Sequence, residues 1–268
     1  MPATATGPSW NDRAIDRVVD ILRGSRSLLF ITGAGISADS GLPTYRGVGG
    51  LYNAGATAEG LPIEDVLSGP MMRRRPELTW KYLGAIEQLA RQATFNRAHQ
   101  VIAEMEAHFP RVWTLTQNID AFHRRAGSRN VLEIHGNLYD LFCTACGYRQ
   151  TVADYSGLQI PPRCPECPGL LRPDVVLFGE MLPTATLERL YAECQAGFDA
   201  VFSIGTTSVF PYIAEPVRMA ADLGRPTIEI NPAASAISDL VDVKLPLGAV
   251  AALDAIWRRY RELDSPRP

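Results

Sequence analysis

Four of the five cysteines form two Cys-x-x-Cys pairs, Cys143 with Cys146 and Cys164 with Cys167, and 17 residues separate the pairs. A two-residue gap lets both thiolates of a pair turn towards one ion, and this spacing is typical of a four-thiolate zinc site. Zinc with four cysteine ligands has no open coordination position, so we predict one structural zinc ion per chain. Two disulfides or a redox Cys-x-x-Cys are weaker alternatives, because no secretion signal is found and the motif occurs twice. Cys194 lies in a helical pattern and is predicted to be a core residue.

A glycine-rich turn follows an apolar run at residues 27–32. Gly33-Ala-Gly35-Ile-Ser-Ala38 matches the pattern Gly-x-Gly-x-x-Ala after a strand. Glycines at these places permit a tight turn and a close approach of backbone amides to a pyrophosphate, and the following helix N-terminus adds partial positive charge. A plain tight turn is the alternative. The acidic residue about 20 positions later that ordinary dinucleotide-binding dehydrogenases use is missing, so that class of enzyme is less favoured.

Polar residues end the next apolar run, in Thr116-Gln-Asn-Ile-Asp120. Side chains at the C-terminal end of a parallel strand face the ligand crevice of a doubly wound sheet. Asn118 and Asp120 are therefore suited to hydrogen-bond ribose hydroxyls or a carboxamide. Capping of the next helix is the alternative role of Asp120.

One of the four histidines has a context that suggests catalysis. His135 follows Val-Leu-Glu-Ile at a predicted strand end, directly before the cysteine-rich segment. An imidazole with a pKa near neutrality is well placed there as a general base, and a structural histidine is the alternative. His99, His108 and His123 lie in helical stretches and are predicted to be structural.

Short apolar runs alternate with longer helical patterns along most of the chain. This alternation predicts an α/β fold with a doubly wound, Rossmann-like parallel sheet. The expected strands are 27–32, 112–117, 174–178, 200–205, 227–231 and 241–245. The expected helices are 10–23, 77–91, 99–108, 184–196, 212–223 and 250–261.

Two segments interrupt the alternation and predict the domain organisation. We expect a loop and helical insertion at 44–97 and a small four-cysteine zinc lobe at 138–172. The Rossmann-like domain then comprises 10–43, 98–137 and 173–263, and 264–268 are expected to form a disordered tail. The cleft between the lobes is the expected place for a ligand.

Composition and charge exclude several classes of function. The net charge of −3 is spread along the chain, and the short basic cluster Arg73-Arg74-Arg75 has no interleaved aromatics, so we expect no nucleic-acid partner. The only lysines, Lys81 and Lys244, do not follow glycine-rich turns, which excludes a Gly-x-x-x-x-Gly-Lys phosphate loop. No apolar run of about 18 residues and no signal peptide are found, so we expect a cytoplasmic protein without a membrane partner. The oligomeric state is not predicted.

The motifs together resemble the sirtuin family. The resemblance covers roughly residues 12–260 and includes 33–47 (Gly-Ala-Gly-Ile-Ser-Ala-Asp-Ser-Gly-Leu-Pro-Thr-Tyr-Arg-Gly), 116–120, His135-Gly136 and the paired Cys-x-x-Cys motifs. Further matches are Arg-Pro-Asp-Val-Val-Leu-Phe-Gly-Glu at 172–180, Gly-Thr-Thr-Ser-Val at 205–209 and Ile230-Asn231.

The resemblance implies a transferase-class enzyme that uses NAD to remove acyl groups from protein lysines, with nicotinamide, O-acyl-ADP-ribose and free lysine as products. Its implied catalytic residues are His135, Asn118 and Asp120, and His135 would take a proton from the ribose hydroxyls. The implied NAD contacts are Gly33, Ala34, Gly35, Ile36, Ser37, Asp39, Pro43, Tyr45, Arg46, Gln117, Asn118, Ile119, Asp120, Gly205, Thr206, Thr207, Ser208, Asn231, Pro232 and Ala249. Val176, Phe178, Gly179 and Glu180 would bind the acyl-lysine peptide by strand addition.

Departures from the family pattern bear on the acyl group. Tyr45 replaces the usual phenylalanine of the cofactor loop, and the Tyr-x-x-Arg motif of succinyl- and malonyl-preferring members is absent, because the best match runs Tyr82-Leu-Gly-Ala85. A free carboxylate in the site would need a cation, so we expect acetyl or another uncharged acyl group, unless the nearby 73–75 arginines substitute. A protein ADP-ribosyltransferase and a non-catalytic module that binds NAD or ADP-ribose are the alternative functions.

Overall fold

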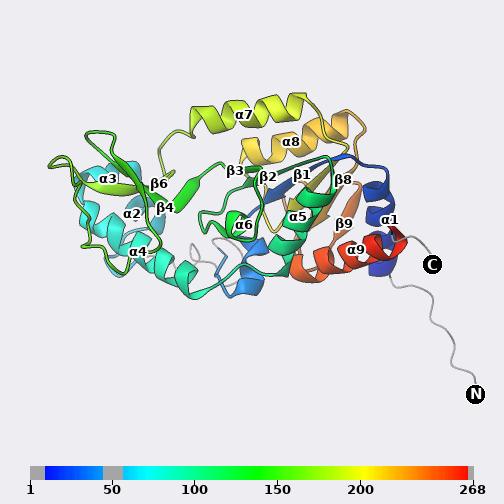
Figure 1. The fold of residues 1–268 in the computed structure, drawn as a ribbon, viewed down its shortest axis with the longest axis horizontal. Helices are drawn as coiled ribbons and strands as arrows, with labels where there is room; N and C mark the ends of the chain where they lie inside the picture. The colour runs from blue at the N-terminus through cyan, green and yellow to red at the C-terminus, as the bar shows by residue number, and fades with distance from the viewer. Residues whose placement is uncertain (1–9, 45–56, 265–268) are drawn as a thin grey trace, which may run out of the picture.

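The structure, a computed structural model, describes residues 10–44 and 57–264. Six parallel strands form the main sheet, in the order β3-β2-β1-β7-β8-β9 (Figure 1). They are β3 (Val131–Glu133), β2 (Arg111–Thr116), β1 (Ser27–Thr32), β7 (Ala200–Ile204), β8 (Thr227–Ile230) and β9 (Val243–Leu245). The order reverses between β1 and β7, and in such sheets ligands bind at that point, beyond the C-terminal ends of the strands.

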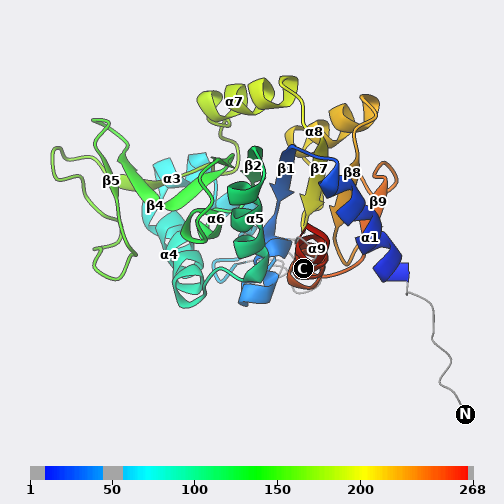
Figure 2. The same cartoon turned by 45° about the vertical axis from the view of Figure 1, so that its right-hand side comes forward.

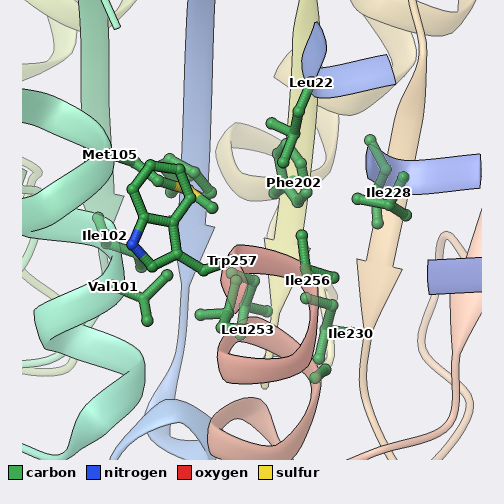
Figure 3. Packing of buried hydrophobic residues seen from close by; sticks show 14 of the residues in the cluster. Leu22, Val101, Ile102, Met105, Phe202, Ile228, Ile230, Leu253, Ile256 and Trp257 are labelled. Carbon is green, nitrogen blue, oxygen red and sulfur yellow. The ribbon is translucent and has the colours of Figure 1, made fainter. Parts of the chain in front are cut away.

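Helices cover both faces of this sheet, since each strand is apolar on both sides. In β1, Leu28 and Phe30 pack on one face with the helices α1 (Trp10–Arg23), α5 (Arg97–His108) and α9 (Ala249–Asp264). Leu29 and Ile31 pack on the other face with α7 (Thr184–Gln195) and α8 (Pro211–Asp222). Figure 3 shows the first of these cores, where Phe202 and Ile228 of the sheet meet helix side chains. The sheet is therefore a rigid support for the loops at its edge.

Each predicted strand and helix has a counterpart in the structure, although one predicted strand is misplaced and several short elements were not predicted. The bounds of α1 and β1 are those predicted, and the other predicted helices differ by a few residues at their ends. The prediction that 174–178 is a strand of the parallel sheet is wrong. The strand found there, β6 (Leu171–Val175), pairs antiparallel with β4 (Gly136–Cys143) in the smaller sheet. The parallel sheet contains β3 instead, an edge strand whose residues precede His135. Asp264, predicted to begin the tail, is the last residue of α9, and 265–268 lie outside the described residues.

The described parts of the two predicted insertions share one hydrophobic core, and the strands of the smaller lobe extend from Gly136 to Val175, beyond the predicted bounds 138–172. The strands β5 (Arg149–Thr151), β4 and β6 make a three-stranded antiparallel sheet, and α2 (Ile63–Val66), α3 (Gly69–Arg74) and α4 (Pro76–Gln92) pack beside it (Figure 2). Trp80 of α4 is fully buried, and its Nε1 donates to the carbonyl of Leu171, 3.1 Å away. The cysteine segment and the helical insertion therefore depend on each other. None of the described helices has the length and apolarity needed to cross a membrane.

Candidate active site

A cavity of about 790 Å³ opens beyond the C-terminal ends of the parallel strands, between the sheet and the smaller lobe. The loops after β1, β2, β7 and β8 supply its polar wall, and the segments 67–86 and 175–182 supply an apolar wall. A second cavity of about 40 Å³ adjoins it and shares Ala34, Ile86, Asn118 and Ile119 with it. Such a cleft, apolar with a few convergent polar groups, is typical of a site for a small molecule.

Three glycines let two backbone segments touch at the floor of the cavity. The amide of Gly33 donates to the carbonyl of Ile204 at 3.1 Å, and the amide of Gly35 donates to that of Gly205 at 2.9 Å. A Cβ on Gly35 would lie 2.6 Å from the Cα of Gly205, and one on Gly205, whose φ is +59°, would collide with the Gly35 backbone. The turn after β1 and the turn after β7 thus form one surface, which any larger residue would separate.

The predicted polar residues after β2 are buried and bonded to this surface. Asn118 Nδ2 donates to the carbonyl of Gly33 at 3.1 Å and to Ser37 Oγ at 3.2 Å. Ser37 Oγ donates to Asp120 Oδ2 at 2.8 Å, and Asp120 Oδ1 accepts from the amide of Phe122, which starts the short helix α6 (Phe122–Arg125). The N-cap of α6 is Ala121, and Asp120, one residue earlier, bonds both to the first amide of the helix and to the network. Burial raises the pKa of Asp120, although both hydrogen bonds oppose this.

His135 reaches the cavity from the loop after β3. Its Nδ1 lies 3.0 Å from the carbonyl oxygen of Gln117, which can only accept, so Nδ1 carries a proton. Its Nε2 lies 2.8 Å from the hydroxyl of Tyr212. Burial lowers the pKa of His135, against the effect of the Gln117 carbonyl, so the ring is neutral near pH 7. A neutral imidazole at a cavity wall is equipped to accept a proton.

The segment after β6 forms the opposite wall of the cavity. The amide of Phe178 donates to the carbonyl of Leu67 at 2.9 Å, and its carbonyl accepts from Gly69 at 3.0 Å. The backbone of Phe178 is thus hydrogen-bonded within the chain. Phe178 also lines the cavity, together with Val176, Gly179 and Glu180, which were predicted with it.

An ion pair between buried Arg172 and half-buried Glu180 supports this segment. Both guanidinium NH groups of Arg172 donate to Glu180, at 2.6 and 3.0 Å, and one also donates to the carbonyl of Val175. Burial would raise the pKa of Glu180, but the Arg172 guanidinium and the amide of Leu177 bring it below its usual value. The pair ties the end of β6 to the residues that line the cavity.

The two Cys-x-x-Cys pairs converge outside the cavity. All five cysteines are free, and the sulfurs of Cys143, Cys146, Cys164 and Cys167 lie within 4.8 Å of one another. Sulfurs around tetrahedral zinc, at Zn–S distances of about 2.3 Å, lie about 3.8 Å apart, so the cluster fits one zinc ion. Backbone amides 3.3–3.4 Å away donate to three of these sulfurs, namely those of Cys143, Cys164 and Cys167. A Cβ on Gly169 would lie 2.9 Å from the Cys143 sulfur, so the turn leaves room only for the cluster.

The structure brings most of the predicted NAD contacts to the two cavities. The larger cavity is lined by Gly33, Ala34, Gly35, Asp39, Gln117, Asn118, Ile119, Gly205, Thr206, Thr207, Asn231, Pro232 and Ala249. The smaller is lined by Ser37, Pro43 and Asp120 as well. Two predicted contacts line neither cavity. Ile36 is fully buried in the core, and the buried Ser208 has its Oγ 3.4 Å from the Oγ of Ser203. Tyr45 and Arg46 lie outside the described residues.

Some residues at the site were not predicted from the sequence. Leu67, Leu83 and Ile86 of the helical insertion line the cavity, as do Phe210 and Tyr212 at the start of α8. Tyr212 follows His135 by 77 residues, and no local pattern relates the two. The helical insertion carries an ordinary amphipathic pattern, so nothing in it distinguishes the residues that face the cavity from those in the core.

Comparison with known proteins agrees with this geometry. A sequence profile of the Sir2 family matches residues 33–211. A protein of Pseudomonas aeruginosa named NAD-dependent protein deacylase 2 is 52% identical over 239 residues, which cover 86% of this chain and 91% of that protein. An NAD-dependent protein deacylase of Aquifex aeolicus is 36% identical over 236 residues, covering 88% of this chain and 96% of that protein.

Solved structures share the whole fold. A crystal structure of a Sir2 homologue in complex with NAD superposes with a TM-score of 0.84 at 34% identity, covering 93% of this chain and 95% of that chain. A complex of Sir2 with a p53 peptide and NAD+ superposes with a TM-score of 0.78 at 28% identity, covering 93% of this chain and 98% of that chain. With the profile match and relatives that share most of its length, the chain belongs to the Sir2 family, the sirtuins.

Proposed function

We propose that the protein removes acyl groups from lysine side chains of proteins and consumes NAD, with nicotinamide, O-acyl-ADP-ribose and free lysine as products. The observation that carries the proposal is the single cavity that joins a glycine-lined turn, the Asn118 network and a neutral His135 to the peptide-binding candidate segment 176–180. Relatives named NAD-dependent protein deacylases and Sir2 structures with NAD and peptide support it.

In this proposal the cavity has a nucleotide part. The turn from Gly33 to Ser37 and the loop from Gly205 to Ser208 would hold the phosphates, because Gly33, Gly35 and Gly205 line the cavity and the two turns pack too closely for a Cβ between them. Asn231, whose Nδ2 donates to the carbonyl of Thr206, would hold the adenosine end. Bound NAD supplies a sugar carbon from which nicotinamide can leave. Asn118 would bind the nicotinamide or its ribose.

His135 is the proposed general base. Its Nδ1 proton is held by the carbonyl of Gln117, so the lone pair that accepts a proton lies on Nε2. The proton would come from a ribose hydroxyl. Because burial lowers the pKa of His135, the base stays neutral to a pH below the usual histidine value, and activity should fall only when the pH passes below that lowered pKa.

The cavity favours an uncharged acyl group. Among the described residues that line it there is no lysine or arginine, and its wall towards the small lobe includes Leu67, Leu83 and Ile86. Tyr82, the candidate for a carboxylate-binding tyrosine, bonds instead through its hydroxyl to Glu59 at 2.5 Å. A succinyl carboxylate would lose its water there without gaining a cation, so we propose acetyl-lysine as the preferred substrate.

The location proposed is the cytoplasm. The four free cysteines that cluster in the small lobe require a reducing environment to stay available to a metal ion, which supports this location.

The test uses purified protein, NAD and matched acetyl- and succinyl-lysine peptides, with mass spectrometry of every product. We expect equal amounts of nicotinamide, free-lysine peptide and O-acetyl-ADP-ribose, and slower turnover of the succinyl peptide. His135→Ala should abolish deacylation while the fold and zinc content stay intact, whereas His108→Ala, away from the cavity, should remain active. ADP-ribose on protein without the ester product would establish the transferase alternative, and wild-type turnover by His135→Ala would remove the proposed base.

A further inference from the structure

The atom of His135 that must accept the proton already has a partner. Nδ1 donates to the Gln117 carbonyl, so the lone pair of the neutral ring lies on Nε2. Nε2 is 2.8 Å from the hydroxyl of Tyr212, which therefore donates its proton to that lone pair. A single lone pair cannot accept strongly from the Tyr212 hydroxyl and from a ribose hydroxyl at once.

Tyr212 is held in this position by its own surroundings. It is the second residue of α8, after Pro211, whose ring fixes the backbone at the helix start. Its ring stacks on Phe210 with centroids 5.5 Å apart and planes 13° apart, and both rings meet the His135 ring edge-on. Burial raises the pKa of Tyr212 to about 12, so its hydroxyl stays protonated and can donate throughout the working pH range.

The other titratable groups around His135 have different partners. Glu133, two residues earlier, pairs with Arg124, and Asp120 accepts from Ser37. Across the cavity, Glu180 is paired with Arg172, and Asp39 accepts from the amide of Val250. The hydroxyl of Tyr212 is thus the titratable group bonded directly to the imidazole.

We propose that Tyr212 is a positioning residue for His135. Its hydroxyl donates to the lone pair that the Gln117 carbonyl leaves on Nε2 and so favours the neutral ring in the substrate-free protein, and it yields that lone pair to the ribose hydroxyl when substrate enters. This inference rests on the proposed function of the site.

The direct test is Tyr212→Phe, which keeps the ring and removes the hydroxyl, followed by ¹⁵N NMR titration of the histidines in the free protein. The chain has four histidines, and the His135 signals are identified by their loss in His135→Ala. A donor to Nε2 stabilises only the neutral ring, so its removal should raise the pKa of His135 by about 0.5 to 1 unit. Tyr260→Phe is the matched control, because that hydroxyl lies 3.1 Å from Nε2 of His108 and should leave the His135 signals unchanged.

Kinetics test the second half of the proposal. The acid limb of kcat/KM for NAD should move to higher pH by the same amount in Tyr212→Phe, while the plateau rate stays within about threefold of the wild type. An unmoved His135 titration would overturn the proposal. A loss of about 100-fold or more at every pH would also overturn it, since a hydroxyl that relays the proton is expected to contribute that much. The NMR titration needs no turnover, so its outcome is separate from whether the protein deacylates lysine.

Discussion

His99 gives the sharpest prediction about stability. It lies fully buried on α5, where the amide of Asn96 donates to its Nδ1, and its Nε2 is buried without a partner among the described residues. Its ring centroid is 4.9 Å from that of His123, whose pKa burial also lowers. Burial lowers the pKa of His99 from 6.5 to about 4. Between pH 6.5 and about pH 4, His99 therefore binds a proton in the unfolded chain but stays neutral in the folded chain.

The size of the effect follows from these two values. A folded pKa of about 4 against 6.5 in the unfolded chain lowers the free energy of unfolding by about 2 kcal/mol between pH 7 and pH 5. This loss grows to about 3 kcal/mol below pH 4, where the folded state protonates too. For a chain of this length, about 2 kcal/mol corresponds to a fall in Tm of about 4–8 °C.

His99→Gln isolates this contribution. His99 is the third residue of α5 and forms a capping box with Asn96, and glutamine is a natural residue at that position, so the cap is preserved. We expect the fall in Tm between pH 7 and pH 5, measured by circular dichroism, to be smaller by about 4–8 °C in the variant than in the wild type. His108→Gln, at a partly exposed surface site, controls for the loss of an imidazole as such. Equal falls in the wild type and His99→Gln would refute the reasoning.

Two further perturbations test the support of the cavity. Glu180→Gln leaves the Arg172 guanidinium buried without its counter-charge, so we expect a loss of about 2–3 kcal/mol in urea unfolding and a raised KM for the peptide, with exposed Glu188→Gln unchanged in both. An unaltered peptide KM would contradict this support role. Cys164→Ala should abolish stoichiometric zinc in elemental analysis and destabilise the small lobe, whereas Cys194→Ala, in another core, should retain both metal and activity. A full equivalent of zinc in Cys164→Ala would exclude the four-thiolate site.

The local elements were within reach of sequence reasoning. In β1 the apolar run alone indicates a strand buried on both faces, and in α1 the helical spacing of Val18, Val19 and Leu22 ends at Gly24, so the bounds of both elements follow from neighbouring residues. The spacing of the two Cys-x-x-Cys motifs likewise indicates a metal cluster, because thiolates two residues apart turn together whatever the rest of the chain does. The spacing of Gly33 and Gly35 likewise indicates a tight turn, although the turn that they touch, at Gly205, is remote in sequence.

Sequence reasoning could not decide which sheet each predicted strand joins. The apolar run that ends at Phe178 fits either sheet, and only the pairing of β6 with β4 decides that 171–175 belongs to the small lobe.

The sequence by itself determined most of the strands and helices around the main sheet, the cysteine cluster and the types of polar group at the ends of the strands. The tertiary structure decided which apolar side chains wall the cavity, that the two insertions share the core around Trp80, and that the Tyr212 hydroxyl meets His135. The physical reason is that periodicity and spacing act between neighbours in the chain, whereas such contacts exist only once long loops have closed and whole elements have packed.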